Sequence, residues 1–104
     1  MPGLSLHPEV HSGLRAIEMY RAQHAGAGAA EVFTGELLDF IVSIGILPGA
    51  GRSRNYAGVE VQTRTFRKRH VVVYVHEDGL VRVLEVHSTW MSEESIEQRI
   101  GQRR

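Results

Sequence analysis

The spacing of the hydrophobic residues changes once along this chain, near its middle. Between residues 10 and 44 apolar side chains recur every three to four residues, which is the period of an amphipathic helix. From Val59 onward valines and threonines alternate with charged residues, which is the period of a strand. Helices followed by a run of strands predict an α+β fold. The 104 residues suffice for one such domain, because domains cluster at about 100–150 residues.

The first half predicts a helical hairpin. A helix begins at His7-Pro8-Glu9, because proline suits the first helical position and Glu9 suits the positive end of the helix dipole. It runs to about residue 23 and is followed by a turn at residues 25–28. A second helix is expected to stop at Gly45. Its apolar stripe consists of Ala30, Phe33, Leu37, Ile41 and Ile44. Because the connection is short, the two helices should pack antiparallel.

The rest of the chain predicts a sheet and a final helix. At the start of the chain, residues 4–6 are expected to form a short first strand. After the hairpin, residues 47–51 form a loop, and three strands follow from Val59, from His70 and from Leu80, with a hairpin turn at Asp78-Gly79. Ser92 can cap a short C-terminal helix. The expected fold is α+β and two-layered, with the helical hairpin packed on a small, mostly antiparallel sheet (β-α-α-β-β-β). We expect residues 1–104 to be a single domain, with residues 91–104 as a tail helix and the other sheet face open to solvent or a partner.

Composition excludes several classes of function. Without cysteine the chain can form neither a disulfide framework nor a thiol nucleophile. No apolar run reaches the length of a membrane span and no signal peptide is visible, so we expect a cytoplasmic protein without membrane contact. The histidines are not spaced as a metal site, and residues 45–53 lack the Walker spacing. We therefore expect no metal and no cofactor.

Positive charge is concentrated in the middle of a neutral chain. Residues 40–76 carry a net charge of +5, although the whole chain sums to zero. Four of these basic residues, Arg64, Arg67, Lys68 and Arg69, lie at a strand end, and Arg52 and Arg54 precede the first long strand. Such a cluster can bind phosphates or an acidic partner. The alternative is a strand end kept soluble by its charge.

Four segments, in this order, resemble the RelE/ParE toxin superfamily of bacterial type II toxin–antitoxin systems. They are residues 29–33 (AAEVF) with Leu37-Leu38, residues 48–54 (PGAGRSR), residues 66–74 (FRKRHVVVY) and residues 81–87 (VRVLEVH). The resemblance covers about residues 4–90 and is closest to the ParE branch. One position differs, because ParE-like members often carry an arginine where this chain has Trp90.

The resemblance implies a toxin that forms a hetero-oligomer with a cognate antitoxin. ParE-like toxins, which belong to plasmid stabilization systems among others, inhibit DNA gyrase by binding. RelE-like toxins instead cleave messenger RNA on the ribosome, and a third reading is a non-toxic interaction module of the same fold. Whether the chain is an enzyme stays open at this point.

The expected site residues follow from these readings. Partner or target contacts are expected at Arg52, Arg54, Arg64, Arg67, Lys68, Arg69 and Trp90. In a ribonuclease, Arg64 and Arg67 would hold the phosphate and His87 would transfer a proton. Alternatively, His87 only bridges backbone groups and Trp90 only packs on a sheet edge. Tyr56 is expected at the surface or an interface, and Tyr74 in the core with its hydroxyl at the rim.

Overall fold

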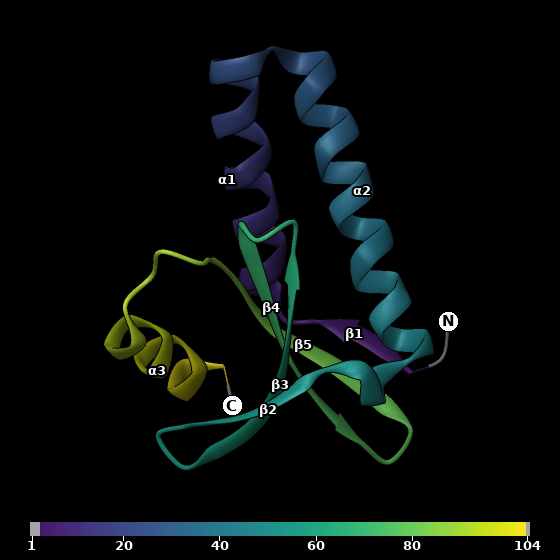
Figure 1. The fold of residues 1–104 in the computed structure, drawn as a ribbon, viewed down its shortest axis with the longest axis vertical. Helices are drawn as coiled ribbons and strands as arrows, with labels where there is room; N and C mark the ends of the chain where they lie inside the picture. Colours follow the sequence, from purple (N-terminus) through teal and green to yellow (C-terminus); the bar gives the residue numbers. More distant parts are fainter. Residues whose placement is uncertain (1–2, 104) are drawn as a thin grey trace.

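A five-stranded sheet in the order β1-β5-β4-β3-β2 separates two helical layers (Figure 1). The structure is a computed structural model that describes residues 3–103, so residues 1, 2 and 104 of the expected domain and tail lie outside the described part. Strand β1 is parallel to β5, and the other neighbours are antiparallel. The predicted α+β class is confirmed. The elements are β1 (Leu4–Leu6), α1 (Pro8–Ala25), α2 (Ala27–Ile46), η1 (Pro48–Ala50), β2 (Arg52–Tyr56), β3 (Val59–Phe66), β4 (His70–Glu77), β5 (Leu80–Ser88) and α3 (Glu93–Gln102).

The helical hairpin forms as the sequence predicts. The His7 ring nitrogen Nδ1 accepts a hydrogen bond of 3.1 Å from the backbone N–H of Glu9, which caps α1. Gly26 alone separates the helices, and its φ of 93° is a conformation that glycine adopts at little cost. Helix α2 continues one residue beyond Gly45, the expected stop. Among the helices of residues 3–103, none is long and apolar enough to cross a membrane.

The base of the hairpin packs on one face of the sheet. Its apolar stripe, including Leu14, Leu37 and Ile41, meets Val72 and Val83 of the central strands in one hydrophobic core. The tip of the hairpin extends beyond the sheet (Figure 1). The hairpin therefore packs on the sheet because the helical spacing of its apolar residues gives it one continuous stripe to bury there.

Strand β2 is an element that hydrophobic spacing did not predict. Residues 52–55, Arg-Ser-Arg-Asn, are all exposed and carry no apolar alternation. They form a strand because they pair with β3 at the edge of the sheet, from Arg52 opposite Thr63 to Tyr56 opposite Val59. Arg52 and Arg54 thus lie on a strand rather than in a loop, and the preceding loop contains the short 3-10 helix η1.

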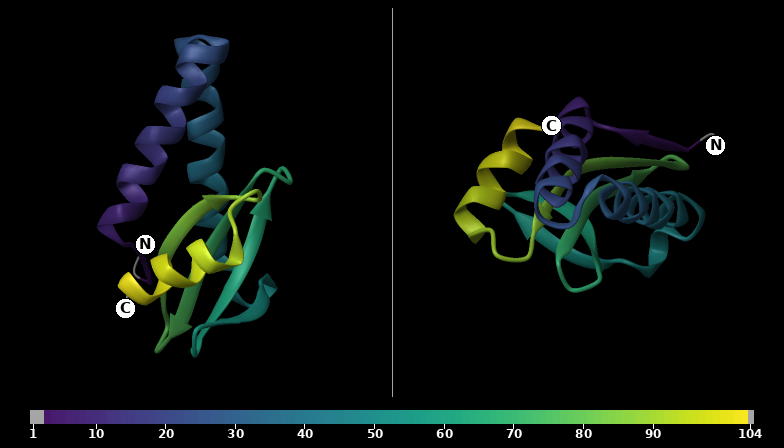
Figure 2. Two further views of the ribbon diagram at one scale, coloured as in Figure 1. Left: turned by 90° about the vertical axis from the view of Figure 1, so that its left-hand side faces the viewer. Right: turned by 90° about the horizontal axis from the view of Figure 1, so that it is seen from above.

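The tail helix covers part of the second sheet face, which was expected to be open. Ile96 and Ile100 of α3 pack with Tyr56, Val73 and Leu84 in a second core. Figure 2 shows α3 lying beside the sheet. A β-bulge in β5 makes this contact possible. Val73 pairs with Glu85 and the next residue, Tyr74, pairs with Val83, so Leu84 is an extra residue without a partner in β4. Leu84 and Glu85 therefore both reach the α3 layer, where Glu85 meets Arg99 and Arg103.

Candidate functional site

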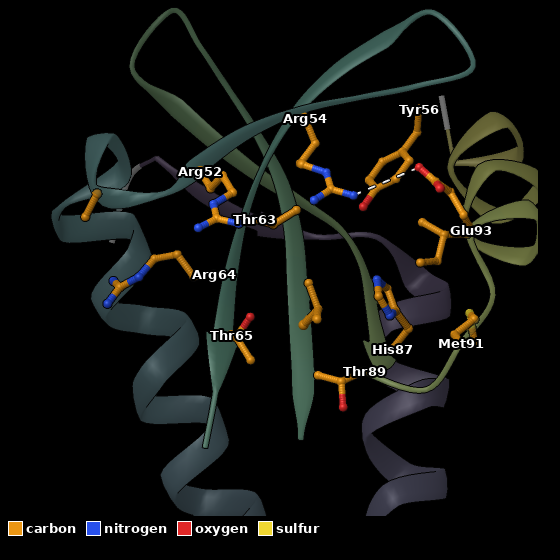
Figure 3. Close-up of a pocket in the computed structure, with 13 residues that line it drawn as sticks. Arg52, Arg54, Tyr56, Thr63, Arg64, Thr65, His87, Thr89, Met91 and Glu93 are labelled. Carbon is orange, nitrogen blue, oxygen red and sulfur yellow. Dashed lines mark ion pairs between the residues drawn. The ribbon is translucent and has the colours of Figure 1, made fainter. Parts of the chain in front are cut away.

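A concave site lies on the sheet face opposite the hairpin, beside α3. Its cavity has a volume of about 580 Å³. Figure 3 shows the side chains rising from β2, β3 and β5, with α1 and α2 behind the sheet. The residues that line this concave site are Ala50, Arg52, Arg54, Tyr56, Thr63, Arg64, Thr65, Val71, His87, Thr89, Met91, Glu93 and Ile96.

The edge strand β2 supplies two of the arginines of the concave site. Arg52 and Arg54 are two residues apart, so they share one face of the strand. The Nη2 atom of Arg54 lies 4.0 Å from the Glu93 carboxylate, and its guanidinium carbon lies 5.5 Å from the Tyr56 ring centroid. Because both members of the Arg54–Glu93 pair are exposed, the pair adds little stability and leaves the guanidinium available to another anion.

His87 forms part of the floor of the site, near the end of β5. Only 5% of its surface is exposed. Its Nδ1 lies 2.8 Å from the carbonyl oxygen of Ser88. A carbonyl can only accept, so Nδ1 carries the proton and the neutral ring has its lone pair on Nε2. Nε2 is buried and has no hydrogen-bond partner among the described residues.

Arg64 and Arg67 turn toward α2 and away from His87. The Arg64 guanidinium lies 4.9 Å from the ring centroid of Phe40 and touches the concave site only at its border (Figure 3). Arg67 makes a 2.8 Å ion pair with Glu36 of α2. The guanidinium of Arg67 also lies 4.8 Å from the Phe66 ring, on the hairpin side of the sheet. Two of the four basic residues at this strand end therefore point toward α2 rather than toward His87.

The remaining expected residues lie elsewhere. Arg69 and Trp90 line a second cavity beside α1, and Trp90 is 92% exposed. Lys68 is exposed in the β3–β4 turn and lines neither cavity. The structure thus brings Arg52, Arg54 and His87 together, with Arg64 at the border.

Sequence reasoning missed several residues of the concave site. Tyr56, expected at the surface or at an interface, is only 4% exposed and forms a wall of the site, so the surface alternative is wrong. Thr63 and Thr65 line the site because they continue the face of β3 that carries Val61. That face could have been read from the alternation of the strand. Within residues 3–103 there is no group of three side chains that could hold a metal ion.

Comparison with known protein families identifies one that the chain matches. Residues 4–92 match the family described as the ParE toxin of the type II toxin–antitoxin system parDE. No curated protein matches the chain. Because the match covers most of the chain, the chain belongs to the ParE toxin family. Helix α3 begins at Glu93, directly after the matched region.

Proposed function

We propose that this member of the ParE toxin family acts in the cytoplasm and inhibits DNA gyrase by binding it. Family membership makes the chain the toxin of a type II toxin–antitoxin pair with an antitoxin partner. In this proposal residues 1–104 are one toxin domain, and α3 is its tail. The proposed target contacts are Arg52 and Arg54, with Arg64 at the border of the concave site.

The arginines of the concave site suit a protein or nucleic-acid partner that carries anions. A guanidinium presents a fixed fork of donors that matches carboxylate and phosphate groups. Arg52 and Arg54 project from an exposed edge strand, so a large partner can reach them. The lining threonines, Thr63 and Thr65, add hydroxyl groups that donate or accept hydrogen bonds.

The burial of the His87 ring supports binding rather than bond cleavage. The proposal depends on this observation. A general base must come within hydrogen-bond reach of the proton that it removes. The Nε2 atom of His87 has almost no exposed surface, and the histidine is enclosed at the floor of the site. A substrate hydroxyl could reach it only after the surrounding side chains move.

Ribosome-dependent cleavage of messenger RNA is the second candidate, and one observation favours it. The Ser88 carbonyl holds the proton of His87 on Nδ1, which leaves Nε2 as a base in the same cavity as Arg52 and Arg54. In that mechanism the arginines would stabilise the phosphate while Nε2 takes a proton from the attacking hydroxyl. The base must then be indispensable.

Inducible expression in a bacterial host separates the candidates. Growth arrest with DNA damage and intact transcripts supports gyrase inhibition, whereas arrest with cleaved transcripts supports the ribonuclease. No arrest supports the third reading, a non-toxic interaction module. The variant His87→Gln adds a second criterion, because a binding toxin keeps its activity and a ribonuclease loses it. Circular dichroism of the purified variant checks that it remains folded.

A further inference from the structure

The second cavity, beside α1, is separate from the concave site and has a different chemistry. Its volume is about 620 Å³, within the range of roughly 300–1,000 Å³ that is usual for binding pockets. We call it the α1 groove. It lies between the second half of α1, the β3–β4 turn and the segment after β5. Its main lining residues are Ile17, Tyr20, Arg21, Arg69, His70 and Trp90.

Two large aromatic side chains at the α1 groove are left in solvent. Trp90 is 92% exposed and Tyr20 is 63% exposed. Tyr20 is held in place by stacking on His24, with ring centroids 4.0 Å apart. Tryptophan and tyrosine are enriched at binding hot spots, where a partner buries them. The groove therefore offers a preformed apolar contact surface that the chain itself does not cover.

The charge of the α1 groove is positive. Its described lining contains no aspartate or glutamate, and none of the ion pairs within residues 3–103 involves Arg21 or Arg69. The pKa of His70 responds to this field. Burial lowers it first, and the nearby charges of Arg21, Arg69 and His87 lower it further. A carboxylate entering the groove would relieve this repulsion.

These properties fit a peptide better than a nucleic acid. Nucleic-acid-binding domains are usually strongly basic, whereas this chain has a net charge of zero. The groove also has an apolar side formed by Ile17 and Ala16, next to only a few cations. An apolar anchor with neighbouring carboxylates would match both parts. Among partners, the antitoxin is the one that family membership supplies.

We propose that the α1 groove binds an acidic segment of the cognate antitoxin. One apolar side chain of that segment packs against Tyr20 and Trp90, and its carboxylates pair with Arg21 and Arg69. This inference rests on the toxin assignment above, although it does not depend on whether the target is gyrase or the ribosome. It also places the antitoxin contact outside the arginines of the concave site.

The test measures the affinity of the purified chain for the small antitoxin encoded beside its gene, by isothermal titration calorimetry. Arg69→Glu and Trp90→Ala should each weaken binding by about tenfold or more, as at an interface hot spot. The matched control is Lys68→Glu, a charge reversal at the neighbouring exposed residue that does not line the groove. It should change the dissociation constant by less than about threefold, since it lies outside the contact.

Several outcomes would overturn the inference. One is equal affinity of the antitoxin for wild type, Arg69→Glu and Trp90→Ala, and another is equal loss of affinity in the Lys68→Glu control. Binding of a single-stranded RNA 12-mer that depends on Arg69, with unchanged antitoxin affinity, would also contradict it. These measurements need no toxic activity, so they separate failure of this inference from failure of the proposed function.

Discussion

Arg99 of α3 donates a hydrogen bond of 3.1 Å to the carboxylate of Glu85 in β5. Glu85 is only 2% exposed, and its other oxygen lies 3.5 Å from the guanidinium of Arg103. One buried carboxylate therefore holds Arg99 of α3 and Arg103, which directly follows the helix. The sheet face and the tail are joined by this pairing as well as by the apolar contacts of Ile96 and Ile100.

Removing this carboxylate should destabilise the protein strongly. Glu85→Ala leaves Arg103, which is 8% exposed, as a buried charge without its partner. Loss of one partner of a buried ion pair costs about 3–5 kcal/mol. The control Arg99→Ala removes a half-exposed partner and should cost about 1 kcal/mol or less. Urea unfolding measures both, and equal stability of Glu85→Ala and wild type would contradict the role assigned to this pair.

The contact between Gly51 and Tyr74 should also be visible in stability. The Tyr74 hydroxyl donates a 2.6 Å hydrogen bond to the Pro48 carbonyl, and burial raises the pKa of this hydroxyl, which keeps it a donor. A Cβ at Gly51 would overlap with that hydroxyl. Gly51→Ala should therefore cost about 1–3 kcal/mol.

Tyr74→Phe should cost about 1 kcal/mol through the lost hydrogen bond. In the double variant the cost of Gly51→Ala should shrink, because the hydroxyl that it strikes is gone. A double-mutant cycle from thermal or urea unfolding gives the coupling between the two changes. Simple additivity of the two costs would show that the hydroxyl is not what excludes a side chain at position 51.

Stability should fall in mild acid because of His70. Its pKa in the folded protein is lowered, first by burial and then by Arg21, Arg69 and His87. The unfolded chain, with an ordinary histidine pKa near 6.5, then binds more protons than the folded protein. The contribution is complete above about pH 6.5 and is lost as the pH falls through the folded-state pKa.

The matched variant for this effect is His70→Gln. Urea unfolding at pH 7.5 and at pH 5.5 should show a smaller drop in the free energy of unfolding for the variant than for wild type. The other histidines remain in both proteins, so the difference isolates His70. An identical drop in both proteins would remove His70 from the acid response.

The arginines of the edge strand should be required for toxicity but not for folding. We expect the double variant Arg52→Glu, Arg54→Glu to lose growth arrest, because its charge would repel the anions that the site is proposed to bind. Both residues are exposed, so stability should change by only about 0.5 kcal/mol. The control is Arg82→Glu, an exposed arginine of β5 outside the concave site, which should still arrest growth. Arrest by the double variant at wild-type expression would exclude the proposed contact.

The sequence predicts most of the fold because the helices and the central strands bury regular apolar patterns. Strand β2 escaped prediction, since its residues 52–55 are exposed and its backbone is fixed only by pairing with β3. The bulge at Leu84 was equally hidden, because one extra residue in a ladder leaves no mark in an apolar strand. Because the pairing of Glu85 with the tail depends on this bulge, the sequence did not predict that pairing either.

The site was predicted only in part, because neighbours in sequence separate in space. Arg67 and Lys68 occupy a tight turn with φ of 52° and 60°, a conformation that non-glycine residues seldom adopt. The turn sends Arg67 toward α2 and Arg69 toward α1. Alternation along β3 places Arg64 on the hairpin side. Arg52 and Arg54 are neighbours in the sequence, but their strand and their shared cavity with His87 come from pairing of the sheet.

Supercoiling by purified DNA gyrase measures the proposed inhibition itself. The purified wild-type chain should inhibit supercoiling of relaxed plasmid DNA, the double variant Arg52→Glu, Arg54→Glu should not, and His87→Gln should inhibit like wild type. Full supercoiling activity in the presence of excess folded wild-type chain would contradict gyrase as the target.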